Sequence, residues 1–183
     1  MKVIMCFGNS LTAGYGVDMQ EAYPALLQKK IDSLGLMYKV VNAGLSGETT
    51  AGGINRLDWV LKEPVAIFIL ELGANDGLRG INVKVTRQNL QQIIDKVKTI
   101  SPGAIIILAG MQIPPSMGAA YTKEFGKIFP ELAEKNDIPL IPFFLKGVGG
   151  ESKLNQGDGV HPTAEGYKVV VENVWEVLKK QLK

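Results

Sequence analysis

The sequence predicts an α/β protein, a three-layer α/β/α sandwich built on a five-stranded parallel sheet. Short apolar runs alternate with longer stretches whose apolar residues recur at helical spacing, which is the order of strands joined by crossover helices. The runs hold almost no polar residues, as in Ala104–Ala109 (AIIILA), and strands covered on both faces need no polar side. No repeat or linker interrupts the 183 residues, so we expect a single domain over residues 1–183.

Each expected element has a local signal. The five expected strands are the apolar runs Lys2–Phe7, Tyr38–Asn42, Ala66–Leu72, Ala104–Ala109 and Pro139–Phe144. Helices are expected from Pro24 to Gly35, over Thr50–Leu61, Val83–Ile100 and Tyr121–Glu134, and from Thr163 to about Leu178. Proline suits the first turn of a helix and glycine the residue after its end, which places the first of these helices.

Composition excludes several classes of function. The formal net charge is +2 and the basic residues are dispersed, so we expect no nucleic-acid partner. No run of 18 apolar residues is present, so we expect no stable membrane insertion. One cysteine and one histidine leave no ligand-spaced cluster, and we expect neither a metal nor a cofactor. We find no signal peptide in this sequence, which leaves the compartment open between the cytoplasm and, after signal removal, the periplasm or the outside of the cell.

The loops that follow the strands should carry the chemistry, because ligands of open parallel sheets bind outside the carboxyl ends of the strands. His161 lies in the last such loop, three residues after Asp158, which can turn back to accept the imidazole N–H. Ser10 follows the first strand directly, where its hydroxyl can point into the cleft. A serine in a turn or a histidine on the surface is common by itself. The prediction of a catalytic site therefore depends on finding these residues together.

Three groups in these loops can donate hydrogen bonds to an oxyanion: the N–H of Ser10, the N–H of Gly44 and the side-chain amide of Asn75. A hydroxyl, an oriented base and three donors, each at the end of an expected strand, predict acyl transfer to water. In that reaction Ser10 is the nucleophile, His161 the general base and Asp158 the residue that orients the imidazole.

A nucleotide-binding module is an alternative for a fold of this class. The chain has no Gly-Lys-Ser/Thr phosphate loop, and Gly14-Tyr15-Gly16 lacks the third glycine of the dinucleotide fingerprint. Asn42 stands at the end of the second strand, where a ribose-binding acid would be expected. The residues therefore favour a hydrolase.

The same residues resemble the SGNH or GDSL hydrolases, a family named for Ser, Gly, Asn and His in four separate blocks. Ser10, Gly44, Asn75 and His161 match these blocks in order, and Asp158 matches the triad acid. The resemblance covers essentially the whole chain and is closest to the bacterial arylesterases, acyl-CoA thioesterases and lysophospholipases. It implies a flavodoxin-like sheet, a mechanism without metal or cofactor, and hydrolysis of carboxylic esters or thioesters through an acyl-enzyme.

The resemblance also implies where the substrate binds. Residues 111–121 (MQIPPSMGAAY) fall where this branch has a substrate-binding loop, which points to Met111, Ile113, Pro114 and Pro115. The expected partner is a small acyl ester or thioester, and the expected state is a monomer or weak oligomer.

Asn9 departs from the family motif, which has aspartate before the nucleophile. Asparagine lacks the negative charge and brings two donor hydrogens. If residue 9 lies near His161, we expect Asn9→Asp to need a higher pH to reach its activity plateau. Two alternatives stay open: a carbohydrate O-acetylesterase, which the wider family includes, and a catalytically impaired acyl-binding relative marked by Asn9.

Overall fold

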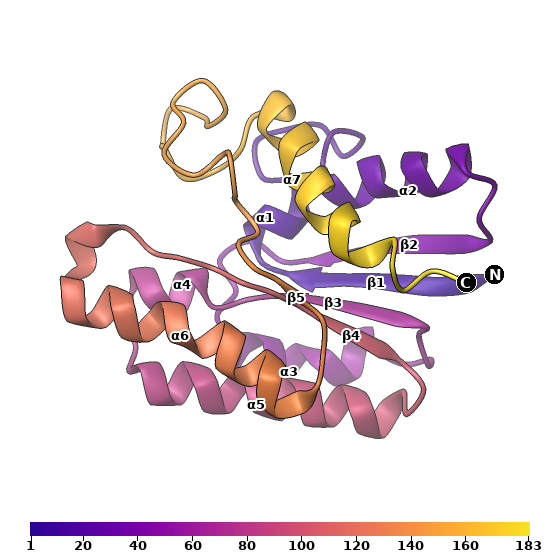
Figure 1. Cartoon of the computed structure of the whole chain (residues 1–183), viewed down its shortest axis with the longest axis horizontal. Coiled ribbons are helices and arrows are strands. Elements are labelled where there is room, and N and C mark those ends of the chain that lie inside the picture. Colours follow the sequence, from indigo (N-terminus) through magenta and orange to yellow (C-terminus); the bar gives the residue numbers. More distant parts are fainter.

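The computed structural model describes all 183 residues and has the predicted three layers (Figure 1). Five strands form one sheet in the order β2-β1-β3-β4-β5, and every neighbouring pair is parallel. The strands are β1 (Lys2–Gly8), β2 (Tyr38–Gly44), β3 (Ile67–Glu71), β4 (Ile105–Ala109) and β5 (Leu140–Ile141). The predicted fold class is confirmed.

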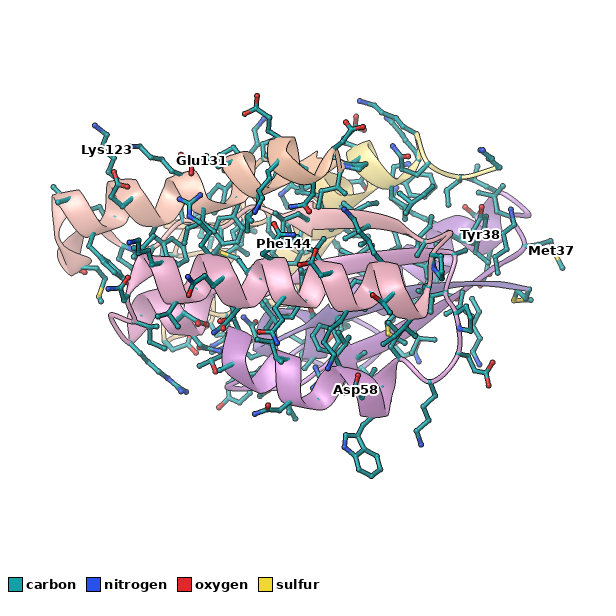
Figure 2. All side chains as sticks on the ribbon, turned by 90° about the horizontal axis from the view of Figure 1, so that it is seen from below. Met37, Tyr38, Asp58, Lys123, Glu131 and Phe144 are labelled. Atoms are coloured by element: carbon teal, nitrogen blue, oxygen red, sulfur yellow. The ribbon has the colours of Figure 1, made fainter.

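Helices cover both faces of the sheet. They are α1 (Ser10–Ala13), α2 (Tyr23–Ser33), α3 (Thr50–Val60), α4 (Ala74–Leu78), α5 (Val83–Ile100), α6 (Ala119–Asn136) and α7 (Ala164–Leu178), with a 3-10 turn, η1 (Pro115–Met117). In Figure 1, α2 and α7 lie above the sheet, and α3, α5 and α6 lie below it. Figure 2 looks onto the lower face, where α5 runs between α3, which carries Asp58, and α6, which carries Lys123 and Glu131.

The core explains why the strands are almost wholly apolar. β3 lies in the middle of the sheet, and its side chains from Ile67 to Leu70 are at most 1% exposed. Successive side chains of a strand point to opposite faces, and here a helical layer covers each face. Both faces therefore belong to one cluster of 41 buried hydrophobic residues.

The local signals hold at several helix ends. α7 begins where predicted, because Thr163 Oγ1 accepts the backbone N–H of Gly166 at 3.1 Å. Pro24 stands in the first turn of α2, and Gly35, with φ +66°, follows its end. α5 has the predicted bounds. No helix of the structure has the length and apolar character needed to cross a lipid bilayer.

Three elements differ from the expectation. β5 pairs over only two residues instead of six, because the register is lost after Ile141: Gly110 N–H donates to Ile141 O, but Gly110 O accepts from Phe144 and not from Phe143. α1 and α4 were not predicted, since helices of four and five residues show no periodicity. Both begin just beyond the carboxyl end of a strand, and they carry Ser10 and Asn75.

Candidate active site

Ser10 is held on a short, tightly packed turn. It is the first residue of α1, and Asn9 Oδ1 accepts the N–H of Leu11 at 2.9 Å, which caps the helix. Gly14, with φ +84°, ends the helix after one turn. Gly8 lets Thr12 of α1 lie close against the end of β1, because a Cβ on residue 8 would lie 2.1 Å from Thr12 Oγ1. The backbone of Ser10 therefore has little freedom.

The structure brings Ser10, His161 and Asp158 into one hydrogen-bonded chain. Ser10 Oγ lies 2.9 Å from His161 Nε2, and His161 Nδ1 lies 2.6 Å from Asp158 Oδ2. If the hydrogen is on Nδ1, the Nδ1–H group donates a hydrogen bond to Asp158. Nε2 then carries no hydrogen and can accept the hydrogen bond of the serine hydroxyl. This arrangement can deprotonate Ser10 as its oxygen attacks a carbonyl carbon.

Asp158 is an ionised acceptor in this arrangement. Its Oδ1 accepts the backbone N–H groups of His161 and Val160 at 3.0 and 2.9 Å. These two hydrogen bonds, together with the one from the imidazole, lower the pKa of Asp158 to about 2. The carboxylate therefore keeps its charge at neutral pH and can stabilise a protonated imidazole.

The loop that carries Asp158 and His161 is closed on itself. Asn155 and Pro162 form an antiparallel bridge, and Gln156 N–H donates to His161 O at 2.7 Å. Gly159, with φ +70°, allows the turn between the two triad positions. The ring of Tyr15 packs on the imidazole, with 4.6 Å between the ring centroids.

Two of the three predicted oxyanion donors have a free hydrogen. The N–H of Ser10 donates no hydrogen bond within the protein. Asn75, in the first turn of α4, donates one amide hydrogen to Glu48 O at 2.9 Å, which orients the amide and leaves its second hydrogen unused. Arg56 fixes Glu48 in turn, through two contacts of 2.8 and 2.6 Å to its carboxylate.

Gly44 does not offer the third donor that the sequence predicts. Its N–H donates to Asn42 Oδ1 at 3.0 Å. The reason lies in the ladder: β2 is an edge strand, Leu45 N–H donates to Gly8 O, and the N–H one residue earlier points away from β1. Asn42 caps that outward N–H, so it is not free for an oxyanion.

Gly47 has the free N–H that Gly44 lacks, although the sequence did not single this residue out. Its N–H donates no hydrogen bond within the protein, and its φ is +81°. The carbonyl of Gly47 accepts from Arg79, and the carbonyl of the next residue, Glu48, accepts from Asn75. Gly47 lies in the turn after β2, two residues beyond the last ladder hydrogen bond of that strand. A glycine in the turn after a strand is the sequence feature that could have marked it as an oxyanion donor.

An apolar cavity of about 380 Å³ opens beside the site. Leu11 and Ala74, the neighbours of Ser10 and Asn75, both line it. All four predicted substrate-binding residues line it as well: Met111, Ile113, Pro114 and Pro115. Met111 and Ile113 are buried and the two prolines are exposed, so the wall is apolar from its buried part to its rim.

Asn9 caps the turn that carries Ser10 and is not hydrogen-bonded to His161. Its side chain is buried. The side chain of Asn9 lies beside Glu71, a buried acid that the sequence did not mark as part of the site. Burial raises the pKa of Glu71 to about 8, and the polar groups of Thr12 and Asn9 near its carboxyl only partly oppose that rise. No group of three or more His, Cys, Asp and Glu side chains comes close enough to hold a metal ion.

Comparisons with known proteins agree with this fold and arrangement. Residues 6–169 match the GDSL-like lipase/acylhydrolase family. Esterase TesA of Pseudomonas aeruginosa is 40% identical over 182 residues, which span 99% of this chain and 90% of that protein. Thioesterase 1/protease 1/lysophospholipase L1 of Escherichia coli K12 is 38% identical over 170 residues, 92% of this chain and 79% of that protein.

A solved structure agrees in three dimensions. The psychrotrophic esterase EstA from Pseudoalteromonas sp., inhibited by monoethylphosphonate, is 34% identical, covers 98% of each chain and superposes with a TM-score of 0.91. Sequence and fold thus match relatives of this kind from the first strand to the last helix, and the chain belongs to the GDSL-like lipase/acylhydrolase family.

Proposed function

We propose that this protein hydrolyses carboxylic esters and thioesters through an acyl-enzyme formed on Ser10. The observation that carries the proposal is the chain of contacts from Ser10 Oγ to His161 Nε2, at 2.9 Å, and from His161 Nδ1 to Asp158, at 2.6 Å. Relatives named as an esterase and as a thioesterase and lysophospholipase support the same chemistry.

In the first step His161 Nε2 accepts the hydroxyl proton of Ser10 while Oγ bonds to the acyl carbon. The carbonyl oxygen becomes an oxyanion, which receives the N–H of Ser10 and the free amide hydrogen of Asn75. We assign the third donor to the N–H of Gly47, because that group is free and adjoins the residue that orients Asn75. The carbonyl re-forms when the alcohol or thiol departs with the proton from His161.

The second step reverses the roles. His161 takes a proton from water as the water oxygen attacks the acyl carbon, and the ester bond to Ser10 breaks. The proton then returns to Ser10 Oγ, and the carboxylic acid leaves. Asp158 stays ionised throughout, in keeping with its low pKa.

The cavity beside the site favours an acyl chain of several carbons over acetate. Its 380 Å³ lies within the range of small-molecule pockets, and an acetyl group would leave most of it empty. For this reason an acyl esterase or thioesterase fits better than the carbohydrate O-acetylesterase.

A fluorophosphonate probe, followed by peptide mass spectrometry, tests the proposal. We expect an adduct on Ser10 and turnover of p-nitrophenyl esters, with neither in Ser10→Ala. A folded parent protein that forms no adduct and hydrolyses no ester would overturn the proposal and leave the acyl-binding relative as the better description.

A further inference from the structure

The two halves of the site come from distant parts of the chain, and few contacts hold them together. Ser10 and His161 are 151 residues apart. Besides their own contact, two hydrogen bonds tie residues 9–22 to the C-terminal part of the chain: Gln156 Nε2 donates to Tyr15 O at 2.7 Å, and Tyr167 Oη in α7 donates to Leu11 O at 2.9 Å. Few hydrogen bonds therefore fix the relative position of nucleophile and base, and the Gln156 amide is the one that the loop carrying His161 itself supplies.

Gln156 also grips the backbone around the histidine. Its second amide hydrogen goes to Pro162 O at 2.9 Å, and its own N–H donates to His161 O at 2.7 Å. One residue thus binds the carbonyls of His161 and Pro162 and, across the boundary, that of Tyr15. All three contacts act on groups that determine where the imidazole lies.

The backbone beside Tyr15 leaves room for the Gln156 amide. A Cβ on Gly16 would lie 2.1 Å from Gln156 Oε1, and Gly16 has φ +79°, so the backbone can approach the amide only because residue 16 is glycine. Fixing Tyr15 O also fixes the Tyr15 ring, which packs on His161 with 4.6 Å between centroids and an interplanar angle of 44°.

We propose that Gln156 is a positioning residue, whose amide clasps the Tyr15 turn to the histidine loop and thereby sets the distance from Ser10 Oγ to His161 Nε2. This inference rests on the proposed function of Ser10 and His161. A general base works only within hydrogen-bond reach of the proton that it takes, and a displacement of about 1 Å can cost on the order of 100-fold in rate. A neutral amide suits the task, because it donates to two carbonyls at every pH at which the enzyme is folded.

The test compares Gln156→Met with Gln91→Met. Methionine keeps the length of the side chain and removes its donors. Gln91 is a matched control: its amide also donates two hydrogen bonds, to Asp95 and Asn136, both at 2.9 Å, but it joins α5 to α6 away from the site. We expect Gln156→Met to lower kcat by about 10–100-fold and to change KM less than twofold, since Gln156 does not line the acyl cavity. Gln91→Met should keep the parent kcat.

A second readout reports geometry without activity. His161 is the only histidine, so its imidazole NMR signals need no assignment by mutation. The Tyr15 ring lies on the imidazole and shifts those signals by its ring current. We expect Gln156→Met to move them and Gln91→Met to leave them in place. If Gln156→Met does not fold, Gln156→Glu keeps the shape, lacks both amide donors, and should give the same two results.

Unchanged kcat in the Gln156 variant would overturn the inference, and so would a fall in kcat with unmoved imidazole signals, because the residue would then act on stability alone. A parent enzyme with no Ser10-dependent turnover would instead overturn the proposed function. The NMR comparison separates the two failures, since it detects the clasp in either case.

Discussion

Glu71 lies beneath the turn that carries Ser10, and its Oε1 accepts a hydrogen bond from Thr12 Oγ1 at 2.9 Å. Its other carboxyl oxygen is buried and has no hydrogen-bond partner. An unpaired buried charge is costly, so burial raises the pKa of Glu71 to about 8 and the group is neutral at pH 7. Tyr23 and Tyr167 face it, and burial raises the pKa of both phenols.

Glu71 should make the protein less stable as the pH rises. The folded protein holds this proton up to about pH 8, whereas the unfolded chain loses it near 4.5. The stabilisation is therefore fully present below pH 4.5 and is lost as the pH rises toward 8. When the pH rises from 5 to 9, we expect the unfolding free energy of the parent to fall by on the order of a few kcal/mol more than that of Glu71→Gln.

Urea unfolding at the two pH values measures this difference. Glu63→Gln is the control, because Glu63 is exposed and forms no ion pair. If Glu71→Gln and Glu63→Gln show the same pH dependence as the parent, Glu71 does not carry the buried proton.

Asn9→Asp should act through Glu71. An aspartate at residue 9 can still accept the Leu11 N–H and cap α1, but it places a second carboxyl beside Glu71. Like charges oppose ionisation, so we expect stability to fall more steeply above pH 7 than in the parent. Adding Glu71→Gln should remove that extra fall, and a double-mutant cycle of urea unfolding measures the coupling. A coupling of zero would contradict the contact between the two residues.

Asp158→Asn should leave the loop folded and disable the base. Asparagine Oδ1 can accept the backbone N–H groups of Val160 and His161 as the carboxylate does. It removes the charge that stabilises a protonated imidazole, and we expect kcat to fall by about 10²–10⁴-fold. Turnover of a p-nitrophenyl ester gives the number. Parent-like turnover would remove Asp158 from the triad.

Asn75→Ala removes one proposed oxyanion donor, and kcat should fall by about 10²–10³-fold. Asn82→Ala serves as the control, since Asn82 is exposed and caps α5 by accepting the N–H of Lys84. It should cost about 1 kcal/mol of stability and leave kcat at the parent value. Equal kcat in the two variants would rule out the amide of Asn75 as a donor.

The apolar cavity predicts a chain-length trend. Each methylene moved from water into it is worth about 0.8 kcal/mol, or up to about fourfold in kcat/KM. We therefore expect p-nitrophenyl esters to improve from acetate to longer chains and then level off. Ile113→Trp should fill part of the cavity, which Ile113 lines, and lower the octanoate-to-acetate ratio of kcat/KM. An unchanged ratio would place the acyl chain elsewhere.

The sequence by itself determined the architecture and pointed to the three residues that the structure joins in one hydrogen-bonded chain. Because the strands are covered on both faces, their apolar composition alone identifies them as strands. The Thr163 cap and the bounds of α5 depend on contacts between residues close in the sequence. Ser10, Asp158 and His161 all lie in segments that follow the carboxyl ends of strands, and parallel strands bring such segments to one edge. Each of these inferences needs only local patterns and one rule of topology.

The tertiary structure alone decided which groups near the site are free, buried or linked. Gly44 and Gly47 are alike as residues, and what distinguishes them is that Asn42 accepts the N–H of Gly44 at the end of β2, whereas the N–H of Gly47, in the turn that follows, has no acceptor. In the sequence Glu71 is only an acid at the end of an apolar run. In the structure α1 packs over its side chain and excludes water from it. Gln156 meets Tyr15 across 141 positions. Hydrogen bonding and desolvation depend on distances between segments remote in the chain, and local sequence patterns do not contain those distances.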